Sequence, residues 1–214
     1  MNIRVKLVNW DEGNYLVTDT PRPRGEIHVG GDNIAAGYFK NEKKTEEDFY
    51  EEDGRRWFRT GDIGEIYEDG VLKIVDRKKD LVKLQHGEYV SYGKVEAVLK
   101  TCPVVENVCL YADPSKSYLI AMVVPDRAKL RELVVDEIVS LEAAIKDKDL
   151  EKKIVALIVS YGQQNGLERF ELPTKLVLTL DEWTPESGLV TAAFKIRRRQ
   201  IVDHYRESID RIYV

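Results

Sequence analysis

Thr60-Gly61-Asp62 places a carboxylate beside a glycine, directly after a strand-like segment. A carboxylate held this way can accept two hydrogen bonds from the diol of a ribose, as acidic residues do in dinucleotide sites. Read alone, the same three residues more often indicate an aspartate that caps a turn. Asp62 is therefore a candidate nucleotide-binding residue with a structural alternative.

A run of five charged residues, Asp76-Arg77-Lys78-Lys79-Asp80, follows a strand pattern. A guanidinium is a preferred partner of phosphate and hydroxyl groups, so Arg77 is a second candidate nucleotide-binding residue. The character of the chain changes at this run, and charged side chains at a hinge can exchange partners at low cost. The alternative is a solvated boundary loop.

Lys195 follows an almost uncharged loop and begins a basic segment, K-I-R-R-R-Q-I-V-D-H-Y-R-E-S-I-D-R-I-Y. A lysine on such a loop can act as a point charge on a phosphate or a carboxylate and stabilise charge that develops in a transition state. The segment predicts one helix over 195–213 with its arginines exposed. Taken alone, Lys195 is a surface lysine at the start of that helix.

Several other chemistries lack the residues that they need. The three histidines are far apart and have no metal-ligand spacing, so we expect no metal site. The motifs of covalent hydrolases and of Walker phosphate loops are absent. Cys102 and Cys109 have no zinc-site partners and are expected to be reduced thiols.

Composition indicates a globular chain with no general affinity for polyanions. The 214 residues are 43% hydrophobic, enough for a packed core, and carry a net charge of -5. We therefore expect no nucleic-acid partner. No apolar run is long enough for a membrane span, so a soluble chain on the cytosolic side is expected.

Hydrophobic periodicity predicts a mixed α+β chain in two parts. The first part, 1–76, is β-rich, with strands at 3–8 and 26–31, a short helix with a capping box at Thr45 and a hairpin around Asp69-Gly70. The second part, 77–214, alternates helices and strands. Its expected strands are 81–84, 88–90, 104–112, 118–124 and 171–180, and its expected helices are 91–100, 125–134, 136–161 and 195–213.

Three ordered motifs together resemble the adenylate-forming enzymes, most closely the long-chain acyl-CoA synthetases. They are W-F-R-T-G-D-I-G-E, L-K-I-V-D-R-K-K-D-L-V-K-L-Q-H-G-E-Y-V-S and L-V-T-A-A-F-K-I-R-R-R. The resemblance implies that 1–76 is the β-rich C-terminal part of a large AMP-binding domain. It implies that 77–214 is a small, mobile α+β lid domain.

The family activates a fatty acid with ATP to an acyl-adenylate and then transfers the acyl group to CoA, and Mg²⁺ is expected for the full-length enzymes. The N-terminal phosphate loop and acyl-pocket motifs of the family do not occur in this chain. The resemblance thus implies the C-terminal portion of a ligase, inactive without its N-terminal domain. Members are often associated with the endoplasmic reticulum, the mitochondrial outer membrane or lipid droplets, so membrane association here would depend on an upstream segment.

The resemblance also assigns roles to single residues. Asp62 matches the aspartate that holds the ribose hydroxyls of AMP, Arg77 the arginine that contacts the nucleotide, and Lys79 the hinge residue. Lys195 resembles the lysine that bridges carboxylate and α-phosphate during adenylation. The segment that lines the CoA channel is matched by Lys83, Gly87, Glu88 and Tyr89.

Two residues depart from the pattern of many members, which have glycine in place of Phe194 and of Asp76. Phe194 and Asp76 are both compatible with a resemblance to the long-chain acyl-CoA synthetases. A different class of function is a stand-alone binding or regulatory module that uses the basic C-terminal helix on an acidic partner or a membrane.

Overall fold

A computed structural model describes residues 3–134 and 138–213 of the chain, which form two compact units, Met1–Leu81 and Val82–Val214. The sequence placed the boundary five residues earlier, between 76 and 77. The first unit extends further because the strand that ends at Arg77 is paired with the preceding strand, and the short 3-10 turn after it stays with the same unit.

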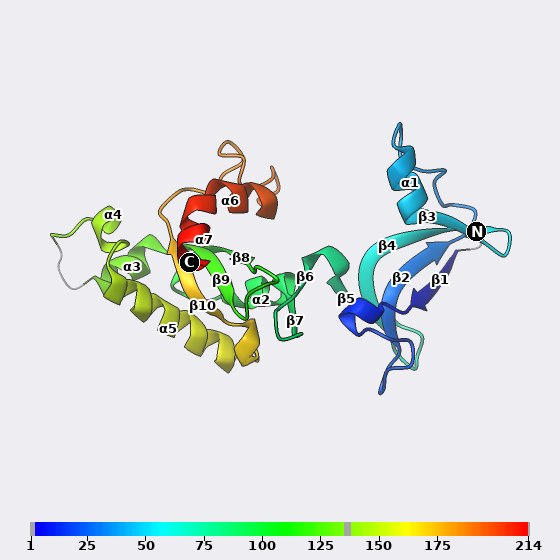
Figure 1. Ribbon diagram of the computed structural model, residues 1–214, viewed down its shortest axis with the longest axis horizontal. Coiled ribbons are helices and arrows are strands. Elements are labelled where there is room, and N and C mark those ends of the chain that lie inside the picture. Colours follow the sequence, from blue (N-terminus) through cyan, green and yellow to red (C-terminus); the bar gives the residue numbers. More distant parts are fainter. Residues whose placement is uncertain (1–2, 135–137, 214) are drawn as a thin grey trace. The chain divides into compact units, whose positions relative to one another are not determined.

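Unit 1 is built on one antiparallel sheet with the strand order β1-β2-β4-β3, to which β5 is added through β4 (Figure 1). The long strand β4 is therefore the centre of the unit. The elements of unit 1 are β1 (Arg4–Val8), η1 (Asp11–Gly13), β2 (Arg24–Gly30), α1 (Glu42–Asp48), β3 (Phe49–Glu52), β4 (Arg55–Ile66), β5 (Leu72–Arg77) and η2 (Lys78–Asp80).

The expected strands at 3–8 and 26–31 and the hairpin around Asp69-Gly70 are confirmed, whereas the expected cap is wrong. Helix α1 is capped by Asn41, whose side chain accepts the backbone N–H of Lys44. The hydroxyl of Thr45 donates instead to the carbonyl of Asn41 and accepts the N–H of Tyr38. Thr45 therefore joins the preceding loop to the helix from inside the first turn, where a helical threonine can reach a carbonyl four residues back.

Unit 2 contains a three-stranded sheet in the order β10-β9-β8 and a separate two-stranded pair, β6 and β7. Strand β9 is antiparallel to β8 and parallel to β10, because a long helix connects β9 to β10. The elements are β6 (Leu81–Lys83), β7 (Tyr89–Ser91), α2 (Tyr92–Leu99), β8 (Val105–Tyr111), β9 (Leu119–Pro125), α3 (Arg127–Leu133), α4 (Leu141–Ala144), α5 (Lys148–Gln164), η3 (Arg169–Glu171), β10 (Pro173–Leu178), α6 (Arg198–His204) and α7 (Arg206–Tyr213).

Helices cover both faces of this sheet, which explains why β9 reads as an unbroken apolar run. Leu119, Ala121 and Val123 point into a core with α2 and α5. Ile120, Met122 and Val124 belong to a second core, which α6 and α7 complete. Two buried cores on opposite faces hold the C-terminal helices firmly against the sheet (Figure 1).

Two expected helices are interrupted. Only part of the 136–161 pattern forms the helices α4 and α5, and residues 135–137 lie outside the described part of the chain. The C-terminal helix begins at Arg198 rather than Lys195 and is divided at Tyr205 into α6 and α7. Tyr205 is buried and its hydroxyl donates to Asp181, so its side chain is directed into the core at the break.

Candidate functional site

A cavity of about 480 Å³ in unit 1 contains the predicted nucleotide residues. Asp62, Arg77 and Lys79 all line it. Asp62 and Arg77 are direct cross-strand partners in the β4–β5 hairpin, and Nε of Arg77 lies 2.9 Å from Oδ1 of Asp62. Fifteen positions apart in sequence, these two residues thus meet because the Asp69-Gly70 turn folds one strand back on the other.

The backbone around Gly61 determines how Asp62 is presented. The sequence predicted a turn at Thr60-Gly61-Asp62, but β4 continues through these residues, with Gly61 at a φ of 71°. This left-handed conformation favours glycine. The hydroxyl of Thr60 donates to the carbonyl of Ile27 (2.8 Å) and accepts the N–H of Asp62 (3.0 Å). The strand therefore changes direction locally while the Asp62 carboxylate stays on the cavity side.

The charges of this pair suit a nucleotide. The side chain of Asp62 is 22% exposed, while that of Arg77 is 56% exposed. A partly buried carboxylate can accept the two hydroxyls of a ribose, and an exposed guanidinium can move to phosphate oxygens. The opposite charges of Arg77 and Asp62 partly neutralise each other.

Lys79 lies on η2, two residues before the end of unit 1. Its side chain is exposed, whereas the neighbouring Lys78 is half-buried. The predicted hinge residue thus stands next to the division between the compact units. Its role as the pivot stays a prediction.

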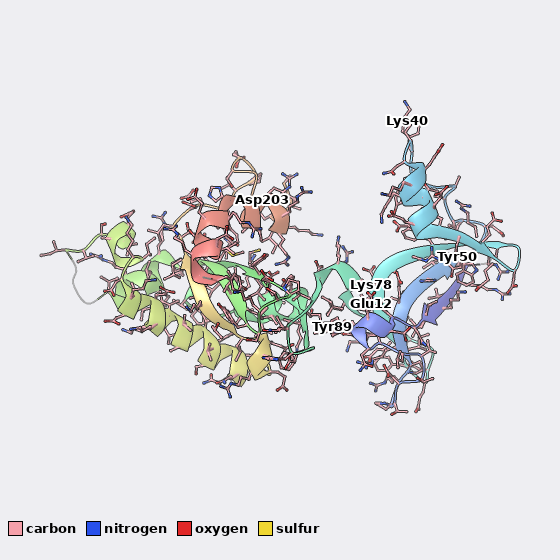
Figure 2. All side chains as sticks on the ribbon, viewed as in Figure 1. Glu12, Lys40, Tyr50, Lys78, Tyr89 and Asp203 are labelled. Carbon is pink, nitrogen blue, oxygen red and sulfur yellow. The ribbon has the colours of Figure 1, made fainter. Side chains whose placement is uncertain are left out.

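Four further candidates are brought together in one short hairpin of unit 2. Leu84 and Val90 are buried and fix its base, while Gly87 is exposed at the tip with a φ of 97°. The N–H of Gly87 donates to the carbonyl of Leu84 (2.9 Å), and the N–H of Leu84 donates to the carbonyl of Glu88 (2.9 Å). At the strand ends, Nζ of Lys83 lies 5.3 Å from the ring centroid of Tyr89, which Figure 2 labels.

Lys195 is presented by a second tight hairpin in unit 2. Val190 and Ile196 form a β-bridge, and Thr191 exchanges backbone bonds with Lys195 (2.8 Å) and Phe194 (2.8 Å) across the turn. Lys195 is exposed. Phe194 has a φ of 55° and is 64% exposed, so it occupies a left-handed position where glycine carries less strain.

Arg198 corrects the expectation that the arginines of the C-terminal helix are solvent-exposed. Its guanidinium pairs with both carboxylate oxygens of Glu96, at 2.9 Å for Nη2 and Oε2, and donates to the carbonyl of Leu110. The ring of Tyr92 lies beneath it, 4.2 Å from Cζ. Burial opposes the charge of Arg198, but the hydrogen bond and attraction from Glu96 outweigh it and raise the pKa.

Sequence reasoning missed Glu96 and Arg198, because Arg198 lies in a strongly basic run and its partner Glu96 is 102 positions away. The spacing from buried apolar residues could have pointed to both side chains. Glu96 follows the buried Val95 within α2, and Arg198 precedes the buried Ile201 by one turn. Only the packing of α6 against β8 brings the two together. A second buried acid that was missed, Glu26, lies on β2 beside Gly61.

Curated relatives match the chain over almost all of its length. It is 49% identical over 219 residues to "Long chain acyl-CoA synthetase 8" of Arabidopsis thaliana, covering 98% of this chain and 30% of the relative. It is 39% identical over 214 residues to "Long-chain-fatty-acid--CoA ligase 1" of Schizosaccharomyces pombe, covering 98% of this chain and 31% of the relative. The chain is homologous to the C-terminal portion of long-chain acyl-CoA synthetases.

Solved structures agree with this synthetase assignment. The A-PCP didomain of carboxylic acid reductase from Segniliparus rugosus, in complex with AMP, aligns with a TM-score of 0.83 at 30% identity. The alignment covers 99% of this chain and 28% of that chain. The fold is therefore that of the C-terminal part of adenylate-forming enzymes. No protein-family model matches the chain.

The chain spans about 30% of the length of the curated relatives that it matches. Among residues 3–134 and 138–213, no group of three or more histidine, cysteine, aspartate or glutamate side chains could hold a metal ion. The Mg²⁺ expected for full-length relatives has no cage of protein ligands in this part, and Mg²⁺ commonly binds substrate phosphates with only one or two carboxylates. Within the same ranges, no helix is long and apolar enough to cross a membrane.

Proposed function

We propose that this segment supplies part of the nucleotide site and the mobile lid of an ATP-dependent long-chain fatty acid CoA ligase. The observation that carries the proposal is the Asp62–Arg77 pair in the 480 Å³ cavity, in a chain homologous to long-chain synthetases. Fatty acid, ATP and CoA are the substrates of the complete ligase. We expect the 214-residue chain alone to be inactive, since it spans about 30% of the length of the relatives.

Different residues act in the two half-reactions. Asp62 holds the ribose of ATP and AMP, and Arg77 contacts the nucleotide. The Lys195 hairpin enters the site during adenylation, and its ammonium stabilises the charge that develops between carboxylate and α-phosphate. The Lys83–Tyr89 hairpin, with Gly87 and Glu88 at its tip, lines the pantetheine channel during thioester formation. Rotation at Lys79 exchanges the two hairpins.

One observation supports this division of roles. Lys195 and Gly87 lie on separate exposed hairpins of unit 2, each with a tightly bonded base, so each is a rigid loop suited to insertion. The basic-helix alternative gains no such support. The apolar face of α6 and α7 is already packed against the sheet, and Arg198 is paired with Glu96.

The direct test uses a chimera in which the N-terminal region of the Arabidopsis relative is joined to residues 1–214. The chimera is supplied with ATP, Mg²⁺, palmitate and CoA. We expect the chimera to release pyrophosphate and form palmitoyl-CoA, and the 214-residue chain alone to do neither. Asp62→Asn should raise the KM for ATP about tenfold to a hundredfold, because two hydrogen bonds lose their ionised acceptor.

The control for this test is the Arabidopsis protein with its own C-terminal region. If that control is active and a folded chimera is not, the proposed function is wrong. Robust pyrophosphate release by the 214-residue chain alone would contradict its inactivity.

Lys79→Pro in the chimera should slow thioester formation about tenfold while adenylation changes less than threefold. Proline fixes φ at the residue that has to rotate between the two half-reactions. Pyrophosphate release and palmitoyl transfer to CoA are measured separately in single turnovers. An equal loss in both steps would contradict the hinge assignment.

A further inference from the structure

Glu26 is a buried acid at the centre of unit 1 to which the proposed chemistry gives no role. It lies on β2 and is 7% exposed. Its two carboxylate oxygens have different partners. Oε1 accepts the backbone N–H of Gly61 (3.2 Å), and Oε2 accepts Nζ of Lys78 (3.0 Å), which Figure 2 labels.

The buried ring of His28 lies beside the same carboxylate. Nε2 of His28 lies 3.4 Å from Oε2 of Glu26, and Nδ1 of His28 lies 2.7 Å from the hydroxyl of Tyr50. His28 is 4% exposed. Burial favours the neutral acid, but the nearby His28 and the ammonium of Lys78 outweigh it and lower the pKa of Glu26 to about 2. Glu26 is therefore a carboxylate at neutral pH.

The position of Glu26 in the sheet explains why a side chain bonds the backbone here. The register between β2 and β4 shifts between Glu26 and His28, and Thr60, Gly61 and Asp62 have no direct partner across this shift. The N–H of Gly61 would otherwise lack a ladder acceptor. Oε1 of Glu26 takes that place, next to the residue that carries the nucleotide-binding carboxylate.

The second carboxylate oxygen of Glu26, Oε2, binds a different segment of the chain. Lys78 directly precedes Lys79 in η2, and its ammonium lies 3.0 Å from Oε2 of Glu26. One carboxylate thus contacts the residue before Asp62 and the residue before Lys79. Both contacts lie within unit 1.

We propose that Glu26 is a positioning residue that links the backbone beside Asp62 to Lys78, the residue before the hinge. Rotation then begins after Lys78. The inference rests on the proposed function of the same site. Glu26 does not contact the nucleotide in this scheme. It acts through Gly61 on the direction of Asp62 and through Lys78 on the start of the moving segment.

The first test needs no catalysis and uses amide hydrogen exchange in the 214-residue chain. Glu26→Gln should speed exchange of the Gly61 amide about tenfold to a hundredfold, because the charged acceptor is lost. Lys78→Met should leave Gly61 within threefold of the parent chain and lower the order parameters of residues 78–80. Glu51→Gln, which changes a 74% exposed carboxylate on β3 that lies 3.7 Å from Arg56, is the control in the same unit.

The second test measures steady-state kinetics in the chimera. Glu26→Gln should raise the KM for ATP about tenfold while kcat changes less than threefold, since Asp62 binds the ribose in ground and transition states alike. Glu26→Asp should recover part of the loss, and Glu51→Gln should match the parent.

The outcomes separate the two proposals. Unchanged exchange at Gly61, or an unchanged KM for ATP despite faster exchange, would overturn the positioning role of Glu26. If Glu26→Gln does not fold, Lys78→Met tests the proposed link between Glu26 and the hinge. Unchanged order parameters at 78–80 would overturn that link. A parent chimera without ligase activity would contradict the proposed function, whereas the exchange result would still decide whether Glu26 holds the two segments.

Discussion

Lys195→Ala in the chimera should lower the rate of acyl-adenylate formation about a hundredfold to a thousandfold. An ammonium group directed at the charge that develops in the transition state, in a site that excludes water, typically contributes a rate factor of this size. Thioester formation from preformed palmitoyl-adenylate should stay within threefold of the parent, because a different hairpin then occupies the site. Pyrophosphate release and palmitoyl transfer are followed separately in single turnovers.

The matched control is Arg199→Ala, which removes a neighbouring cation whose side chain is 90% exposed and pairs only loosely with Asp203 at 3.9 Å. It should leave both half-reactions within twofold. Lys195→Arg keeps the charge but changes its shape and reach, so partial recovery is expected. Equal losses in both half-reactions for Lys195→Ala would exclude a role confined to adenylation.

Glu96→Ala should destabilise unit 2 by about 3–5 kcal/mol, the cost typical of leaving one member of a buried ion pair alone. The side chains of Glu96 and Arg198 are only 12% and 23% exposed. Without Glu96, the guanidinium keeps the carbonyl of Leu110 but loses its counter-charge. The free energy of unfolding is measured in urea, with hydrogen exchange at β8 to follow unit 2 separately.

Two comparisons make this stability prediction specific. Asp149→Ala removes an exposed i,i+3 pair with Lys152 and should cost less than about 1 kcal/mol. The double variant Glu96→Met with Arg198→Met should be more stable than Glu96→Ala, because no unpaired charge stays buried. A cost near zero for Glu96→Ala would mean that Arg198 reaches solvent.

The sequence by itself determined the elements and most of the candidate residues. Period-two alternation and the Asp69-Gly70 turn predict the β4–β5 hairpin, and the apolar run at 118–124 predicts the buried strand β9. The ordered motifs pointed to the synthetase family, which the relatives confirm. These signals are local or follow from chain order, so no tertiary contact is needed to read them.

Tertiary structure alone decided which charged residues are partly or fully buried. Glu26 and Lys78 are 52 positions apart, and Glu96 and Arg198 are 102 apart. Each looks like a solvated charge in sequence, because burial of a charge depends on a partner that only the fold supplies. The start of α6 at Arg198 instead of Lys195 has the same cause: the Val190–Ile196 bridge places Lys195 in a hairpin, and packing on β8 directs Arg198 inward.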